Sequence, residues 1–254
     1  MNAMVKRQLE HRTIREFKDE AIPTEILEQL LEVARRTASS TGMQACSVIR
    51  VTDPEIKREI SKVCEQDYVA RAPELLIFIV DLYRNWRIAQ EKNYFGKSAM
   101  TMDSFFSAFT DACITAQNVV NAAEAIDLGT VYFGSILNDP AKICDILNLP
   151  ELTFPVVGLG IGYPNQSPQL KPRMSMELRL FENTYTSFES YLEKIEDYDK
   201  EMRTYYDLRN ANRRVDCFSD QVVTRFENSL PKRQEILNFI RKQGFDLKVS
   251  EEEI

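Results

Sequence analysis

The spacing of apolar residues predicts helices and strands that alternate along most of the chain. Residues 23–38 carry their apolar side chains on one stripe at helical spacing, and Pro54 begins a second such segment. Short β-branched or apolar runs that are typical of strands occupy residues 48–51, 130–133 and 154–161. Residues 75–80 are apolar on both faces, which predicts a central strand covered by helices on both sides.

Residues 102–128 form the longest helical pattern in the chain. The apolar residues between Phe105 and Ala123 are spread nearly all round this helix, and Gly129 is suited to ending it. A helix that is apolar on nearly all sides is buried in a large core or in a subunit interface. The pattern alone leaves both interpretations open.

The pattern changes after about residue 165. Residues 166–179 are rich in Pro, Lys and Arg and show little periodicity. A charged, aromatic-bearing helix is predicted over residues 185–206, a polar loop over 207–219 and a last helix over 231–243. Because helices and strands alternate loosely, we expect an α/β or α+β fold with a helix-covered sheet, in which the C-terminal part is an appended arm rather than a clearly independent domain.

Composition and charge exclude several classes of function. The net charge of −7 makes a nucleic-acid or anionic-membrane partner a poor expectation. His11 is the only histidine, so the chain cannot build a site from two or three histidines. Five scattered cysteines without a C-x-x-C motif argue against a disulfide framework or a zinc site. Without a secretory signal or an apolar run long enough to span a bilayer, a cytoplasmic protein with reduced thiols is expected.

The first candidate site is the segment His11-Arg12-Thr13-x-Arg15. The planar fork of an arginine suits phosphate, and a threonine hydroxyl adds a donor. The segment therefore predicts a phosphate-binding site. The alternative interpretation is a solvated, charged surface strand.

The second candidate is the run Ser39-Ser40-Thr41-Gly42-Met43-Gln44, which follows the first helix. Its hydroxyls and amide place short donors and acceptors close to the backbone, as a flat polar ring or a ribityl chain requires. The alternative interpretation is a helix cap followed by a loop.

Two further basic clusters lie in the C-terminal part. Lys171-Pro172-Arg173 holds two cations on either side of a rigid residue, which suits a phosphate or an exposed turn. Arg209 with Arg213 and Arg214 can hold the 2′-phosphate of NADPH or form a solvated loop.

The spacing Gly158-x-Gly160-x-Gly162 is not interpreted as a dinucleotide fingerprint. These glycines lie inside an apolar strand pattern, and Tyr163-Pro164 stand where a helix has to begin. Close packing of a strand is the better interpretation. The chain also lacks a G-x-S-x-G elbow and a Walker loop.

Five motifs together resemble one family. They are H-R-T-I-R-E-F at 11–17, S-S-T-x-x-Q at 39–44, V-Y-F-G-S at 131–135, G-L-G-I-G-Y-P at 158–164 and L-K-P-R at 170–173. In this order and spacing, the chain resembles the NADPH-dependent flavin reductase and oxygen-insensitive nitroreductase subgroup of the nitroreductase superfamily. Thr13 stands where serine is usual, and Ser135 where glycine is usual.

The resemblance implies a layered α/β/α sandwich with a central, mostly antiparallel sheet, over a single domain of residues 1–254 with an extended arm from about residue 166. It implies an intertwined homodimer with FMN bound non-covalently at two sites built from both subunits. The FMN phosphate is expected to be bound by His11, Thr13, Lys171 and Arg173, with Arg12 nearby. Arg15 is expected to lie at the pyrimidine side of the ring. The ring and ribityl chain of FMN are expected to be lined by Ser39, Ser40, Thr41, Gln44 and Gln66. The backbone near the N5 edge of the ring is expected to come from Tyr132, Gly134 and Ser135. NADPH is expected to contact Arg209 and Arg213.

The expected function is therefore that of an FMN-dependent NAD(P)H oxidoreductase working by a ping-pong mechanism. Nitroaromatics, quinones, free flavin or other small electrophiles are the expected oxidants. A fixed Arg15 would stabilise the negative charge that reduced flavin carries near N1 and O2. A flavin carrier or regulator without turnover and a plain dimeric scaffold remain alternatives. Residues 84–104, with Trp86, Tyr94 and Phe95, form a candidate lid over the flavin or else a surface helix and turn.

Overall fold

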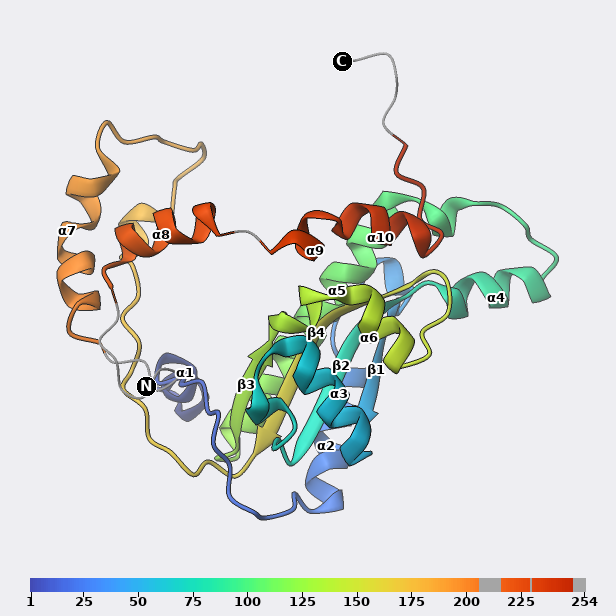
Figure 1. The fold of residues 1–254 in the computed structure, drawn as a ribbon, viewed down its shortest axis with the longest axis horizontal. Helices are drawn as coiled ribbons and strands as arrows, with labels where there is room; N and C mark the ends of the chain where they lie inside the picture. The colour runs from blue at the N-terminus through green and yellow to red at the C-terminus, as the bar shows by residue number, and fades with distance from the viewer. Residues whose placement is uncertain (206–215, 229, 249–254) are drawn as a thin grey trace. The chain divides into compact units, whose positions relative to one another are not determined.

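The computed structural model describes residues 1–205, 216–228 and 230–248 (Figure 1). The chain divides into two compact units. The first comprises Met1–Gln166 and Leu230–Ile254, and the second comprises Ser167–Ser229. Each unit is described by itself below.

A four-stranded antiparallel sheet forms the centre of the first unit (Figure 1). Its strands are β1 (Cys46–Val51), β2 (Glu74–Asp81), β3 (Gly129–Phe133) and β4 (Thr153–Gly162), in the order β1-β2-β4-β3. This arrangement confirms the predicted α+β fold with an antiparallel sheet. Strand β3 lies at one edge, which leaves its outer backbone groups available to another segment.

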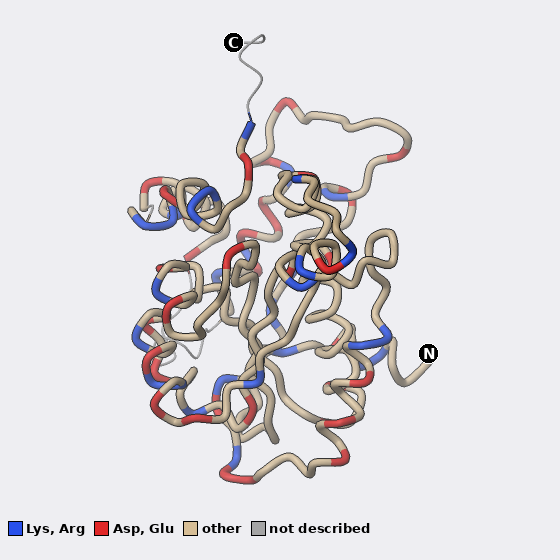
Figure 2. The backbone as a smooth tube through the Cα atoms, turned by 90° about the vertical axis from the view of Figure 1, so that its right-hand side faces the viewer, with Lys and Arg blue, Asp and Glu red and all other residues tan. Residues whose placement is uncertain are grey.

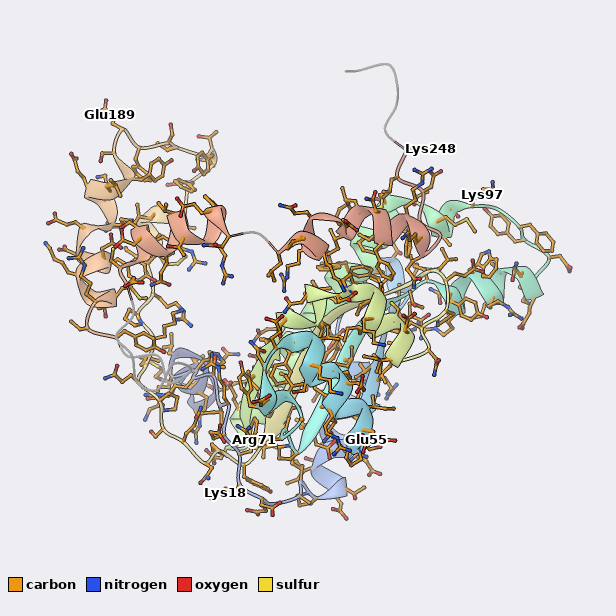
Figure 3. The ribbon with its side chains drawn as sticks, viewed as in Figure 1. Lys18, Glu55, Arg71, Lys97, Glu189 and Lys248 are labelled. Carbon is orange, nitrogen blue, oxygen red and sulfur yellow. The ribbon has the colours of Figure 1, made fainter. Side chains whose placement is uncertain are left out.

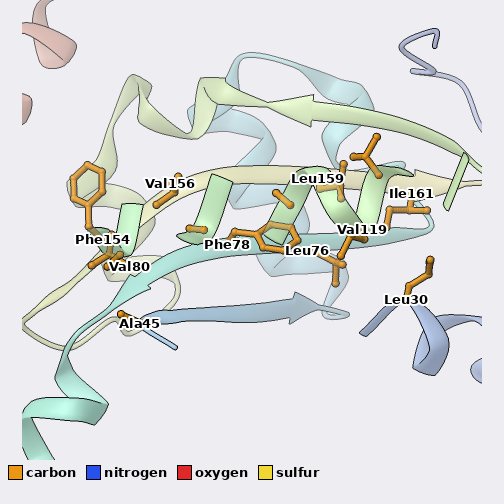
Figure 4. Packing of buried hydrophobic residues seen from close by; sticks show 14 of the residues in the cluster. Leu30, Ala45, Leu76, Phe78, Val80, Val119, Phe154, Val156, Leu159 and Ile161 are labelled. Carbon is orange, nitrogen blue, oxygen red and sulfur yellow. The ribbon is translucent and has the colours of Figure 1, made fainter. Parts of the chain in front are cut away.

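Helices cover both faces of the sheet. Since side chains alternate between the two faces of a strand, β2 contributes apolar side chains to a core on each face. On one face, Leu76, Phe78 and Val80 of β2 pack with α2 (Thr24–Arg35) and α5 (Met102–Ala125) (Figure 4). On the other face, Leu75, Ile77 and Ile79 share a core with α3 (Pro54–Cys64) and α6 (Pro140–Ile146). All residues from Leu75 to Val80 are buried, which confirms the prediction of a strand covered on both sides.

Local sequence signals account for where these helices begin. Asp53 accepts a hydrogen bond from the backbone of Glu55 at 2.7 Å ahead of α3, and Asp139 accepts from Lys142 at 3.1 Å ahead of α6. Proline follows each aspartate at the first helical position, where its missing N–H costs nothing. Thr101 caps α5 through Ser104.

The remaining helices of the first unit are α1 (Ala3–Leu9), α4 (Tyr83–Glu91), α9 (Pro231–Gln234) and α10 (Ile236–Lys242). The predicted helix over residues 231–243 is thus broken at Glu235 into α9 and α10. Ile240 and Phe245 return to the main core, where the Phe245 ring meets the Phe105 ring edge-on at 4.9 Å. Helix α1 was not predicted, because it has no buried residue to give an apolar stripe.

The second unit contains α7 (Tyr191–Met202) and α8 (Phe218–Glu227). The helix predicted over residues 185–206 begins later, because Ser190 caps it by accepting from Glu193. The predicted end of the loop over 207–219 was wrong, since α8 begins at Phe218. That helix is fixed by Asp199 of α7, which accepts from the backbone and hydroxyl of Ser219 at 3.0 and 2.5 Å.

Charged residues are distributed over the whole chain. Lys and Arg residues are interspersed with Asp and Glu residues along the chain rather than gathered on one element (Figure 2). In the part of the chain that the structure describes, none of the helices combines the length and the apolar character needed to cross a bilayer.

The glycines of β4 are packing positions, as the strand interpretation predicts. A Cβ on Gly162 would lie 2.7 Å from the Pro73 ring and 2.8 Å from the Phe17 ring. We therefore expect Gly162→Ala to lower the free energy of unfolding by about 1–3 kcal/mol, measured by urea denaturation. Gly134→Ala is the matched control, because no atom lies within 4 Å of its added Cβ. Equal stability of the two variants would contradict this packing role.

Candidate functional site

The segment that follows α1 is bound along the edge of the sheet. Ile14 donates its backbone N–H to Thr130 at 2.9 Å, and Lys18 donates to Tyr163 at 2.9 Å. Gly129 permits the close approach, since a Cβ there would lie 2.8 Å from Ile14. Arg71 binds Glu16 at 2.7 Å, at the same end of the sheet as Lys18 (Figure 3). The segment is therefore held by the sheet and is more than a solvated surface strand.

His11 is oriented by a carboxylate on α5. Its Nδ1 lies 2.6 Å from Oε1 of Glu124, and the Thr130 hydroxyl donates to the same oxygen at 2.8 Å. The Glu124 side chain is only 13% exposed, so this interaction takes place in a partly desolvated position. A proton on Nδ1 donated to Glu124 leaves Nε2 as the unprotonated nitrogen of a neutral ring.

The arginines of this segment suit an anion. Arg12 donates from Nη1 to the backbone carbonyl of Glu10 at 2.9 Å. Its Nε is buried and, among the described residues, has no hydrogen-bond partner. A buried N–H of a guanidinium is costly without an acceptor, and a phosphate oxygen supplies one. Thr13 and Arg15 are half-buried beside it along the same segment.

Strand β3 leads into a second group of predicted residues. Ser135, in the 3₁₀ helix η4 (Gly134–Asn138), donates its hydroxyl to Oε1 of Gln66 at 2.9 Å. Tyr132 donates its hydroxyl to Gln117 of α5 at 3.3 Å, and burial raises the pKa of Tyr132, so this group stays protonated. The space above Gly134 is open, and its carbonyl accepts from Arg233 at 2.6 Å.

The loop of residues 39–44 is fixed by side chains from other elements. Ser40 donates its backbone N–H to Oδ1 of Asp111 at 2.8 Å. Arg84 and Asn85 of α4 donate to the carbonyls of Gln44 and Met43, respectively. Thr41 and Gln44 have positive φ values of 49° and 51°, a conformation that needs such support. The loop is therefore a built structure rather than only the end of α2.

Two cavities flank this loop. The larger, of about 510 Å³, is lined by Ser40 and Thr41 together with Trp86 and Tyr94. The smaller, of about 250 Å³, is lined by residues that include Ser39 and Gln44. Asp111 lines both cavities. Trp86 and Tyr94, from the predicted lid over residues 84–104, line the larger cavity, and their place over a flavin stays a prediction.

Within one chain the segment of residues 11–15 and the 39–44 loop are attached to α5 at different points. His11 contacts α5 at Glu124, whereas the 39–44 loop contacts it at Asp111. With a rise of 1.5 Å per residue, these two carboxylates are about 20 Å apart along the helix. The structure therefore brings His11, Arg12, Thr13 and Arg15 together along β3 and keeps the loop apart from them.

The remaining predicted residues belong to the C-terminal part. Lys171 and Arg173 are exposed residues of the second unit, where Arg173 donates to the carbonyls of Lys171 and Pro172 at 3.1 and 3.2 Å. Arg209 and Arg213 lie outside the described residues, as does Arg214.

Three of the five cysteines are poor nucleophiles because they are shielded from water. All five are free thiols. Burial raises the pKa of Cys46 and of Cys64 to about 11, and that of Cys144 to about 12. Since the thiolate is the reactive form, these three thiols are inert at neutral pH.

Sequence reasoning missed Asp111, Glu124 and Arg233. The first two carried a usable signal, because each is an acidic residue at a helical spacing otherwise occupied by buried apolar residues. Arg233 gave no such signal, because its partner Gly134 lies 99 positions earlier in the sequence.

Comparisons with known proteins give a consistent result. A family model described as "Nitroreductase family" matches residues 9–163, and one described as "Nitroreductase family, C-terminal domain" matches residues 171–248. The chain is similar to an "FMN reductase (NADPH)" from Bacillus subtilis, with 32% identity over 97% of this chain and 99% of that protein. It is 33% identical to an "Oxygen-insensitive NADPH nitroreductase" from Salmonella typhimurium, over 92% of this chain and 95% of that protein.

A solved structure gives the same likeness in three dimensions. It is described as the "NADPH:FMN oxidoreductase from Vibrio harveyi complexed with NAD+". It aligns with a TM-score of 0.87 and 29% identity, covering 97% of this chain and 100% of that chain. The likeness therefore extends over both units of the chain.

The role of Glu124 can be tested directly. Glu124→Ala removes the acceptor of the His11 ring and of the Thr130 hydroxyl, and we expect it to lower the free energy of unfolding by about 1–3 kcal/mol. Because His11 is the only histidine, ¹⁵N NMR of labelled histidine reports its tautomer without overlap. Glu124→Gln keeps an acceptor oxygen and serves as the control. An unchanged tautomer in Glu124→Ala would contradict the orienting role.

Proposed function

Because this chain belongs to the nitroreductase family, we propose that it is an FMN-dependent NAD(P)H oxidoreductase that reduces small molecules by a ping-pong mechanism. The family comprises NAD(P)H-dependent flavin and nitro reductases, and the chain is an enzyme of this kind. Nitroaromatics, quinones and free flavin are the proposed oxidants. The observation that carries the proposal is the segment 11–15, which is fixed against β3 with cationic groups in place for a phosphate.

The proposed phosphate site of the first unit consists of His11, Arg12 and Thr13. Lys171 and Arg173 are proposed as further phosphate ligands on the motif L-K-P-R at 170–173 alone. The buried Nε of Arg12 supports the site of the first unit, because this donor needs an acceptor. The Glu124 contact supports it too, because it fixes the His11 ring before any ligand arrives. A site prepared in this way spends little conformational entropy on binding.

When bound, FMN would take up hydride from NAD(P)H and deliver two electrons to the oxidant. The protein's own task is then to bind the ring and to balance its charge. We propose that Arg15 lies at the pyrimidine side of the ring and stabilises negative charge there. Tyr132, Gly134 and Ser135 would present backbone near the N5 edge, and the open space above Gly134 supports a close approach. Gln66, held by Ser135, would contact the ring from the same side.

We further propose that the active protein is a homodimer in which each flavin site takes residues from both chains. The attachment of the 11–15 segment and of the 39–44 loop to α5 supports this, since the attachment points Glu124 and Asp111 are about 20 Å apart along the helix. The 39–44 loop, with Ser39, Ser40, Thr41 and Gln44, would then complete the site of the partner subunit. Helix α5 also exposes apolar side chains, with Phe106 60% and Ile114 40% exposed. Exposed apolar residues on an otherwise buried helix are typical of an interface.

The role of Arg15 is tested by pre-steady-state reduction. Arg15→Ala is expected to slow the bleaching of bound flavin by NADPH by about 10²–10³-fold, because it removes a fixed positive charge. Arg58→Ala, on the exposed face of α3, is the control. Full flavin content together with an unchanged rate in Arg15→Ala would show that the assigned role is wrong.

NADPH recognition is assigned to Arg209 and Arg213. The double variant Arg209→Ala/Arg213→Ala is expected to raise KM for NADPH and to leave KM for NADH nearly unchanged, because only NADPH carries a 2′-phosphate. Steady-state kinetics with both nucleotides measure the difference. An equal rise for both nucleotides would remove the 2′-phosphate assignment.

A further inference from the structure

The larger cavity lies between α4, the connection that follows it and the first half of α5, in the first unit. The helices that bound it are labelled in Figure 1. Its volume of about 510 Å³ is within the range of small-molecule sites, roughly 300–1,000 Å³. Trp86 and Tyr94 provide aromatic surface, and Asn85 is held in place by its hydrogen bond to the Met43 carbonyl at 2.8 Å.

Asp111, which lines this cavity as well as the smaller one, has one side-chain oxygen without a partner within the described residues. Asp111 is 3% exposed, and its Oδ1 accepts from the backbone of Ser40. Its Oδ2 is buried and has no hydrogen-bond partner within the described part of the chain. A buried carboxylate oxygen without a donor is costly, so the position favours a ligand that brings an N–H group.

The charge of the lining selects the kind of ligand. Asp111 and Asp103 line the cavity, and the described lining residues include no Lys, Arg or His. The smaller cavity differs, because Arg35 and Arg84 line it together with Asp111. In the smaller cavity, Arg35 contacts the carboxylate of Glu32 and Arg84 contacts that of Asp81. The larger cavity has acidic lining residues without basic ones among the described residues, so it is unfavourable for anions and favourable for cations.

We propose that this cavity binds a planar aromatic molecule carrying a cationic N–H donor, such as an amidine or an amine, with Asp111 as its anchor. The inference rests on the proposed function, because Ser40 and Thr41 line the cavity and are also assigned to the flavin. It adds a substrate class: cationic aromatic oxidants are accepted in preference to anionic ones. Charge-assisted hydrogen bonding to Asp111 and stacking on Trp86 provide the recognition.

Three probes of the same size test the charge preference. Benzamidine is cationic, benzamide is neutral and benzoate is anionic, while the ring is common to all three. Trp86 is the only tryptophan of the chain, so its fluorescence in the purified full-length protein reports on this cavity alone. We expect saturable binding in the order benzamidine, benzamide, benzoate, with benzamidine at least about 10-fold tighter than benzoate.

The anchor is tested by Asp111→Asn, which keeps Oδ1 as an acceptor for Ser40 and removes the charge. This variant is expected to weaken benzamidine binding by roughly 10-fold to 100-fold and to affect benzamide less. Asp145→Asn on α6 removes a carboxylate outside the lining and is the control for net charge. Equal affinity for benzamidine and benzoate, or unchanged benzamidine binding in Asp111→Asn at unchanged urea stability, overturns the proposal.

Turnover connects the cavity to the reaction. With NADPH, the ratio of kcat/KM for 4-nitrobenzamidine to that for 4-nitrobenzoate should fall in Asp111→Asn relative to the unaltered enzyme. This comparison cancels the different intrinsic reactivity of the two compounds. If NADPH bleaches the flavin but this ratio does not change, the inference fails and the proposed function stands. If the protein binds no flavin but Asp111 still governs benzamidine binding, the proposed function fails and only the binding site remains.

Discussion

The burial of α5 against the central strands is the constraint on which the rest of the structure depends. Its sheet-facing side is built largely from small residues, with Ala108, Ala112 and Ala116 fully buried, so the helix lies close to β2 and β4. Acidic residues on such a helix are tolerated only where donors meet them. Glu124 meets donors from His11 and Thr130, and Asp111 meets one at its Oδ1 from the loop of residues 39–44, while its Oδ2 has no donor within the described residues. The packing of one helix therefore positions both groups of the candidate site.

The distribution of charge separates two kinds of binding surface. Along β3, the segment of His11, Arg12 and Arg15 presents cationic groups, and the buried Nε of Arg12 favours an anion. In the larger cavity, Asp103 and Asp111 provide the opposite sign. The proposed sites for a phosphate-bearing cofactor and for a cationic substrate therefore differ in the sign of their charge.

The sequence predicted the parts of the fold whose residues carry a periodic pattern. Residues 75–80 were identified as a doubly covered strand because side chains on both faces are apolar, and the packing of Gly162 followed from its place in a strand. Helix α1 was missed because it buries no side chain, and the break at Glu235 because the apolar pattern continues across it. Many of the predicted site residues were identified through the resemblance of sequence motifs to those of the family. Asp111 and Glu124 stand out in the sequence as acidic residues at buried spacings of a helix, but their partners lie 71 and 113 positions away and are not encoded in any local pattern.

The fixed segment at β3 and the loop at Asp111 are proposed to serve a flavin that takes hydride from NADPH. The decisive measurement is the visible spectrum of the freshly purified protein, recorded before and after anaerobic addition of NADPH. We expect flavin absorbance that bleaches rapidly when NADPH is added. Flavin that does not bleach would indicate a carrier instead of a reductase. A colourless protein that also fails to take up added FMN would show that these residues do not form a flavin site.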